Sequence, residues 1–348
     1  MKIIKVIIVV GIFLMFMLII AITIVRRPSY TISTNGKLYI VNKLSSSISI
    51  FDLETGRELK EISISVEPHE ITTMTDQKRV VVTNYGTPNM EGKSITSINT
   101  RTNEIEKDID IGESLKPHGI ISFPKSEKVG IVTDIGNDLL VVNIATGIVE
   151  KKISTLQKFS HLLVLHPKKP LVYVTNINSN SVSVVDVELN KVIQIITCGL
   201  GTEGIDITPD GTEIWVTNKI ENSINIINTK TNQITDTLST GKQPLRIKFS
   251  IDGKYSLVTN ANDGTISVFD RYSKKQIKTI TIPGKKNLLE RAFYHTPRPV
   301  GILMHPNRQY AFVANSNADK IEIIDMKTFT IVSTIRTGRV PDGLAFVQ

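Results

Sequence analysis

The pentapeptide Val172-Tyr173-Val174-Thr175-Asn176 decides the fold, because close copies of it recur along the whole chain. Each copy is a short apolar stretch with the β-branched and aromatic residues typical of a strand. The seven copies end at Asn42, Asn84, Asp134, Asn176, Asn218, Asn260 and Asn315. Four of the six intervals between these end residues are 42 residues long, and the other two are 50 and 55. A period of about 40 to 45 residues is typical of a four-stranded propeller blade.

The rest of each repeat contains three further strands. In the fourth copy, an alternating strand at 181–186 follows Asn176, and another strand covers 192–196. An inner strand at 204–207 then leads through the tight-turn signature Pro209-Asp210-Gly211 into the next copy. Seven repeats of four strands predict an all-β, seven-bladed β-propeller.

The two ends of the chain complete one blade of this ring. The segment 341–346 is an inner strand with no successor, and 38–42 is the first strand of the repeat with no predecessor. Pairing the two strands removes exposed sheet edges, which otherwise favour aggregation. We therefore predict a propeller over residues 37–348 that is closed by its N- and C-terminal strands.

An apolar segment precedes the propeller. The twenty residues from Val6 to Val25 carry no charge, and at about 1.5 Å per residue they are long enough to cross about 30 Å of hydrocarbon. We predict one N-terminal transmembrane helix, with a membrane anchor at 1–27 and a linker at 28–36. A cleaved signal peptide is the alternative, but Ala21-Ile22-Thr23 is a poor cleavage site.

The charge and cysteine content exclude several classes of site. The formal charge is +8, but four of the positive residues flank the apolar segment at both ends and therefore give no orientation signal. These residues are Lys2, Lys5, Arg26 and Arg27. The mildly basic remainder is not a nucleic-acid footprint. Cys198 is the single cysteine, which excludes an intrachain disulfide and a cysteine-based metal cluster.

Tyr173-Val174-Thr175-Asn176 and its copies resemble the YVTN-type propeller repeat of bacterial and archaeal surface proteins and of lactonase-like propellers. The resemblance covers about residues 36–348 and implies a propeller that is exported from the cytoplasm. It does not imply one function, because the family includes binding scaffolds and enzymes. The Asn that ends each copy is expected to be structural and to turn the chain between the second and third strands.

Two insertions fall on the same face of the predicted ring. They cover 85–93 and 285–298. The second contains Tyr294, His295 and Arg298, which are suited to a lid or to a rim that contacts an anion. The alternative is that this loop simply packs its apolar side chains onto its neighbours.

One residue in each blade occupies the same entry position of the inner strand. In order round the ring these residues are Asp342, His69, His118, His161, Glu203, Leu245 and Val300. Five consecutive blades thus supply imidazole or carboxylate groups at the mouth of the channel. Such groups bind zinc, copper, iron or manganese, and they would leave a position open for water. The alternatives are an anion or small-ligand site built from the same residues, and a relic of a duplicated Pro-His-Gly entry.

Three other residues stand out by position. Arg246 occupies a slot where most copies have Gly, so it is suited either to hold a substrate carboxylate or to pair with a neighbouring Asp or Glu. His166 and His305 precede prolines in turns of the opposite face. We expect both histidines to be solvated.

These features predict a single-pass membrane protein whose extracytoplasmic propeller binds a small ligand or one divalent metal at the channel mouth. The first alternative is a metal-dependent hydrolase or lyase at the His/Asp/Glu arc, where the metal would lower the pKa of a bound water. The second is a scaffold for a protein or a cell-wall polymer. Nucleic acid is not an expected partner, because aromatic and basic residues cluster in only one loop.

Overall fold

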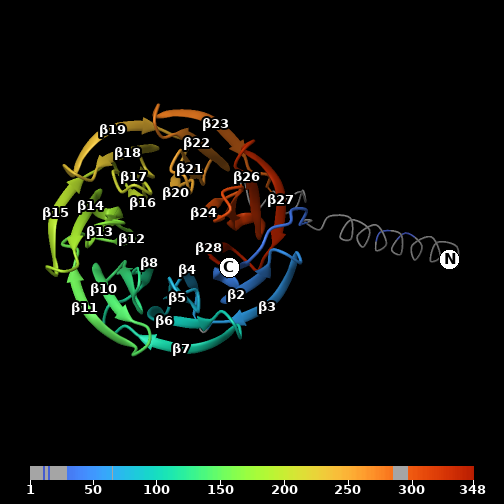
Figure 1. Cartoon of the computed structure of the whole chain (residues 1–348), viewed down its shortest axis with the longest axis horizontal. Helices are drawn as coiled ribbons and strands as arrows, with labels where there is room; N and C mark the ends of the chain where they lie inside the picture. The colour runs from blue at the N-terminus through green and yellow to red at the C-terminus, as the bar shows by residue number, and fades with distance from the viewer. Residues whose placement is uncertain (1–10, 12–14, 16–29, 65, 285–296) are drawn as a thin grey trace, which may run out of the picture.

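The computed structural model describes residues 11, 15, 30–64, 66–284 and 297–348. Its strands form seven four-stranded sheets, which surround a common axis as the blades of a propeller (Figure 1). Neighbouring strands within each sheet are antiparallel. The prediction of an all-β, seven-bladed propeller is confirmed.

Each blade has an inner, a second, a third and an outer strand, counted from the axis. The inner strands are β4 (Pro68–Thr73), β8 (Pro117–Ser122), β12 (Ser160–Leu165), β16 (Thr202–Ile207), β20 (Pro244–Phe249), β24 (Pro299–Met304) and β28 (Pro341–Val347). The second strands are β1 (Lys37–Asn42), β5 (Arg79–Gly86), β9 (Lys128–Thr133), β13 (Leu171–Asn176), β17 (Glu213–Asn218), β21 (Tyr255–Asn260) and β25 (Tyr310–Asn315).

The third strands are β2 (Ser47–Asp52), β6 (Glu91–Asn99), β10 (Asp138–Asn143), β14 (Ser181–Asp186), β18 (Ser223–Asn228), β22 (Thr265–Asp270) and β26 (Lys320–Asp325). The outer strands are β3 (Arg57–Ser63), β7 (Glu104–Asp110), β11 (Ile148–Ser154), β15 (Lys191–Thr197), β19 (Gln233–Ser239), β23 (Lys275–Thr281) and β27 (Thr330–Arg336). Three short 3-10 helices connect second to third strands: η1 (Lys43–Ser45), η2 (Ile177–Ser179) and η3 (Ser316–Ala318).

Strands from the two ends of the chain close the ring. β28 pairs with β1 in antiparallel register, with Lys37 opposite Val347 and Ile40 opposite Leu344. The sheet order is β28-β1-β2-β3, so one blade contains both the first and the last strand. This confirms the predicted terminal closure.

The Asn that ends most second strands has a structural role, as predicted. Asn218 is fully buried, and its side-chain amide donates hydrogen bonds to Ser223 Oγ at 2.9 Å and to Asn225 Oδ1 at 2.8 Å. Asn176 donates in the same way to Ser181 Oγ and Ser183 Oγ. Each amide therefore ties the end of a second strand to the start of the third.

The inner strands approach one another closely at the level of their third residue. A Cβ on Gly301 of β24 would lie 2.1 Å from the carbonyl oxygen of Asp342 on β28. At this level an inner strand carries a side chain only where both neighbouring inner strands have glycine as their third residue. The three side chains are Glu70, Leu162 and Arg246, and the glycines between them are Gly119, Gly204, Gly301 and Gly343.

Each of these close contacts joins the third residue of one inner strand to the second or third residue of the next, so the inner strands run in the same direction along the axis. We call the face at which they begin the entry face and the face at which they end the exit face. The 85–93 insertion lengthens the β5–β6 hairpin on the entry face, where Gly86 pairs with Glu91.

Residues 30–36 pack across the seam between the last blade and the first. The Tyr30 hydroxyl donates to the carbonyl oxygen of Leu53 at 2.6 Å, and the backbone N–H of Thr31 donates to Ser333 Oγ at 2.8 Å. Thr34 Oγ1 lies 3.2 Å from His305 Nε2. From residue 30 onward, the predicted linker therefore belongs to the surface of the propeller.

The predicted anchor at 1–27 lies outside the described residues, apart from residues 11 and 15. Within the described part of the chain, no helix is both long and apolar enough to span a membrane. The anchor therefore stays a prediction from the sequence.

The prediction that His166 and His305 are solvated is wrong. They are 5% and 1% exposed, because each ring folds back into its own turn. The Nδ1 atom of His166 accepts the N–H of Lys168, and that of His305 accepts the N–H of Asn307. The His305 ring also packs 4.7 Å from Phe346.

Replacing Asn218 with Ala tests the role of the repeated Asn. Two buried hydrogen bonds disappear and their partners lose a donor, so the free energy of unfolding should fall by about 1 to 3 kcal/mol. Chemical denaturation measures this change. Asn262→Ala, at an exposed position, is the control, and an equal loss in both variants would contradict the assigned role.

Candidate functional site

The second residues of the inner strands form a buried layer at the entry face, which we call the entry layer. It contains all five predicted ligands. These are His69, His118, His161, Glu203 and Asp342, each at most 8% exposed. Leu245 and Val300 complete the ring and pack against Ala261. The structure thus brings the five predicted residues together at one end of the channel.

Aromatic stacking holds the histidines in this layer. The rings of His118 and His161 are stacked with centroids 3.7 Å apart, and His69 meets His118 edge-on at 4.8 Å. Tyr85, from the end of β5, stacks on His69 at 4.1 Å. The four rings form a continuous aromatic arc along the strand ends.

Asp134 fixes one end of this arc. It accepts a hydrogen bond from the Tyr85 hydroxyl at 2.8 Å, and its Oδ1 lies 3.0 Å from His161 Nδ1. Since an ionised carboxylate can only accept, His161 donates through Nδ1. The Nε2 atom of His161 then faces Glu203 Oε1 at 3.7 Å.

Two lysines neutralise the carboxylates of the entry layer. Lys219 Nζ lies 2.6 Å from Glu203 Oε2, and Lys43 Nζ lies 3.6 Å from Asp342 Oδ2. Each lysine directly follows the Asn that ends a second strand, so the same turn position supplies both cations.

The entry layer does not fit the predicted zinc, copper, iron or manganese site. Among the residues that the structure describes, no group of three or more His, Cys, Asp or Glu side chains is arranged to hold a metal ion. A metal binds in the plane of an imidazole, whereas His118 and His161 turn their ring faces toward each other. We therefore derive no chemical step through a metal.

Burial sets the protonation of the layer. It lowers the pKa of His161 to about 3, although Glu203 opposes this shift. It also holds the pKa of His69 and His118 well below 6.5, reinforced by nearby positive groups. The same burial raises the pKa of Asp134 to about 6. At neutral pH the three imidazoles are uncharged.

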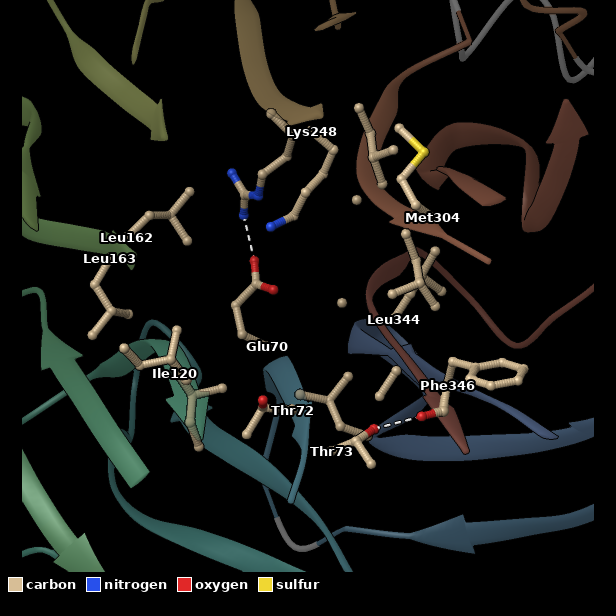
Figure 2. Close-up of a pocket in the computed structure, with 18 of the residues that line it drawn as sticks. Glu70, Thr72, Thr73, Ile120, Leu162, Leu163, Lys248, Met304, Leu344 and Phe346 are labelled. Atoms are coloured by element: carbon tan, nitrogen blue, oxygen red, sulfur yellow. Dashed lines mark hydrogen bonds and ion pairs between the residues drawn. The ribbon is translucent and has the colours of Figure 1, made fainter. Parts of the chain in front are cut away.

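Arg246 lies directly beneath the entry layer and pairs with carboxylates, one of the two predicted roles. Its Nη2 donates to Glu70 Oε1 at 2.6 Å, and its Nη1 lies 3.6 Å from Glu203 Oε1. Burial by itself lowers the pKa of Arg246, but Glu70, Asp342 and Glu203 raise it overall. The Glu70–Arg246 pair joins β4 to β20 across the channel (Figure 2).

A cavity of about 500 Å³ extends from this ion pair toward the exit face. Glu70, Arg246 and Lys248 line it together with the inner-strand residues that follow them, and Pro306 and Phe346 line it near the strand ends. Figure 2 shows Leu162, Leu163 and Ile120 on one side of Glu70, and Met304, Leu344 and Phe346 on the other. We call this space the central cavity. Of the predicted site residues that the structure describes, only Arg246 lines it.

The remaining predicted ligand-binding residues belong to the long loop before β24. Tyr294 and His295 lie outside the described residues. Arg298 is exposed, and its carbonyl oxygen accepts the N–H of Ser316 at 2.9 Å. Arg298 therefore lies on the surface beside β24 and not in the central cavity.

Sequence reasoning missed Asp134, Tyr85, Glu70 and Lys248. Asp134 had a signal, because it is the one repeat end that is not Asn. Glu70 also had a signal, because several other repeats have glycine at the corresponding position, directly after the entry residue. Lys248 gave no comparable signal.

The fold and the channel show that this protein is a seven-bladed propeller with a central cavity large enough for a small ligand. The family described as "Lactonase, 7-bladed beta-propeller" matches residues 19–280, and the chain belongs to this family. The lactonase-like part of the predicted resemblance is thereby confirmed. No curated protein sequence matches the chain.

Solved structures show the same fold at low identity. A functionally unknown protein from Desulfotomaculum acetoxidans is 17% identical with a TM-score of 0.75, covering 90% of this chain and 99% of its own. Kuenenia stuttgartiensis hydrazine synthase is 16% identical with a TM-score of 0.71, covering 82% and 91%. Dihydro-heme d1 dehydrogenase in complex with DHE is 12% identical with a TM-score of 0.63, covering 89% and 65%. At such identities the likeness concerns the fold alone.

The entry layer predicts a loss of stability in mild acid. A buried neutral His118 binds its proton only in the unfolded state, so its contribution is complete above pH 6.5 and is lost as the pH falls. Between pH 7 and pH 5 this amounts to about 2 kcal/mol for one histidine. Asp134, whose pKa is raised to about 6, acts in the opposite direction.

Denaturation at pH 7 and at pH 5 tests this prediction. The free energy of unfolding of His118→Gln should depend on pH less steeply than that of the wild type, by about 2 kcal/mol over this interval. Asn262→Ala carries no titrating change and should keep the wild-type dependence. Identical pH dependence in His118→Gln and the wild type would show that His118 binds its proton as readily in the folded state as in the unfolded state.

Proposed function

We propose that this propeller binds a small organic ligand in the central cavity. The observation that carries the proposal is a cavity of about 500 Å³ that has charged groups at one end and apolar walls. Ligand sites in proteins are usually concave, largely apolar and of about 300 to 1,000 Å³, with a few polar groups that orient the ligand. The entry layer, by contrast, is filled by its own side chains.

The charged end supplies the orienting groups. The Arg246 side chain is 11% exposed and that of Glu70 is 17% exposed, whereas that of Lys248 is 42% exposed. Lys248 Nζ lies 3.1 Å from Asp206 Oδ1, so part of its hydrogen-bonding capacity stays open to a ligand. A ligand atom at this point would meet Arg246 and Lys248, which are already paired with Glu70 and Asp206.

We also propose that the chain is anchored to a membrane through residues 6–25 and carries its propeller outside the cytoplasm. The uncharged run of twenty residues in the sequence supports this. A scaffold for a protein or a cell-wall polymer is the alternative. That alternative depends on the two insertions, of which 85–93 is described and most of 285–298 lies outside the described residues.

Opening of a lactone ring is the second candidate function, favoured by membership of the lactonase family and by the carboxylate in the cavity. Glu70 would take a proton from water while the water oxygen attacks the acyl carbon. Lys248 would stabilise the oxyanion that forms. The ring C–O bond then breaks, and the leaving alkoxide takes up the proton that Glu70 had removed from water, which gives a hydroxy acid and restores the Glu70 carboxylate.

Ligand binding is tested with the purified full-length chain and a small-molecule library in a thermal-shift assay. A ligand of the central cavity should raise the unfolding temperature of the wild type and bind Lys248→Met about tenfold more weakly, because one charged hydrogen bond is lost. Lys230→Met removes an exposed lysine in the β18–β19 turn and should bind normally. Equal affinity of both variants for every stabilising compound would place binding elsewhere.

The lactonase candidate has a separate test. With any lactone that the wild type opens, Glu70→Gln should lower kcat by at least about 100-fold, as expected for a lost general base, with little change in KM. Glu188→Gln, at an exposed position, is the matched control. Unchanged kcat in Glu70→Gln would remove Glu70 from the reaction.

A further inference from the structure

We propose that the ligand of the central cavity is an aliphatic carboxylic acid, with its carboxylate at Lys248 and Arg246 and its hydrocarbon chain along the cavity walls. This inference rests on the proposed function and specifies the class of ligand. It follows from three features of the cavity: the chemistry of its walls, the charges at its closed end and the position of its mouth.

Aliphatic side chains form two facing walls. One wall consists of Ile121, Leu162 and Leu163, and the other of Leu303, Met304 and Leu344. Figure 2 shows Leu162 and Leu163 opposite Met304 and Leu344, with Glu70 and Lys248 between them at the charged end of the cavity. Phe346 is the one aromatic residue among the lining residues. Walls of this kind favour a flexible hydrocarbon chain over an aromatic ring system or a sugar, which would need stacking or hydrogen-bonding partners.

The lining also contains the polar residues Thr72, Thr73, Thr75 and Gln77. Thr73 donates its hydroxyl to the carbonyl oxygen of Phe346 at 2.8 Å (Figure 2), so its donor is already used inside the protein. Between the charged end and the mouth, most of the lining is thus hydrocarbon.

The closed end favours a carboxylate. Arg246 and Lys248 line this end together with Glu70, and each cation already has a carboxylate partner, since Lys248 Nζ lies 3.1 Å from Asp206 Oδ1. Arg246 already binds Glu70, but the more exposed Lys248 has hydrogen-bond donors left for a ligand oxygen. The Glu70–Arg246 pair crosses the channel and stops a chain from passing on toward the entry layer. The ligand therefore enters with its carboxylate first.

The mouth of the cavity lies next to the segment that leads to the N-terminus. Pro306 and Phe346 line the cavity at the exit face. Thr34 and Asn35 contact His305 beside Pro306, with the Asn35 carbonyl oxygen 3.1 Å from His305 Nε2. A chain anchored through residues 6–25 would therefore have its attachment and its cavity mouth on the same face. An aliphatic acid can reach this mouth from a bilayer or from solution.

Photolabelling of the full-length chain in its membrane tests the proposal. The probe is a saturated acid of about twelve carbons with a diazirine in its chain, and labelled peptides are identified by mass spectrometry. We expect labels on β8, β12 and β24, and competition by unlabelled acids that strengthens about fourfold for each added methylene until the cavity is filled. Lys248→Met should reduce this labelling about tenfold, whereas Lys230→Met should not.

A second variant keeps the test independent of the charge. Leu303→Gln places an amide in the aliphatic wall and should flatten the dependence of competition on chain length, while leaving binding of a four-carbon acid unchanged. Labelling by probe preloaded in the bilayer would identify the membrane as a source. Labelling only by probe added to the water would identify the aqueous phase, and either result supports the proposal.

The outcomes also separate this inference from the proposed function. If a short, polar photoprobe labels these strands and the twelve-carbon probe does not, the aliphatic ligand is excluded and ligand binding stands. If neither probe labels them, both proposals fail. Labelling by the long probe that is equal in the wild type and in Lys248→Met would show that the carboxylate is not held where we propose.

Discussion

The close approach of seven inner strands at one axis is the constraint on which the rest of the structure depends. At the third residue of these strands the space is so small that the carbonyl oxygen of Asp342 occupies the place of a Cβ on Gly301. A large side chain fits at this level only between two glycines. Glu70, Leu162 and Arg246 meet this condition, and the opposite charges of Glu70 and Arg246 then join across the channel.

This ion pair divides the channel into two regions of different chemistry. Above it, the entry layer contains uncharged imidazoles stacked on each other and carboxylates matched by lysines. Below it, charged groups end an apolar space that a ligand can enter. The stacked rings and ion pairs of the entry layer tie neighbouring inner strands together, although His69 Nδ1, His118 Nδ1 and Asp342 Oδ1 have no hydrogen-bond partner among the described residues, whereas the open cavity is free to bind. The entry layer therefore has a structural role and the cavity below it the proposed binding role, although both are built from neighbouring residues of the same inner strands.

The sequence was sufficient to predict the seven-bladed propeller, because the strand pattern recurs seven times. Where the strand boundaries of one repeat are ambiguous, the other repeats determine them. It also predicted that His69, His118 and His161 share one level, since an alignment of repeats fixes rank along the strand. The position of a histidine along its strand does not determine the orientation of its imidazole. In the structure the imidazoles of His118 and His161 stack on each other and do not point toward a shared metal ion. The Glu70–Arg246 pair joins residues 176 positions apart, and only closure of the ring determines which strands face each other.

The prediction for His166 and His305 was wrong because solvation was inferred from their place in turns, although each imidazole packs into its own turn.

The pairing of β1 with β28 has a consequence for biosynthesis. Strand β1 lies beside β28, although Lys37 and its partner Val347 are far apart in the chain. Six blades can form while the chain is still being made, but the seventh has no inner strand until Pro341–Val347 has left the ribosome. During that interval one edge of β1 is uncovered, so translation speed and chaperones act on this protein most strongly before β28 has paired with β1.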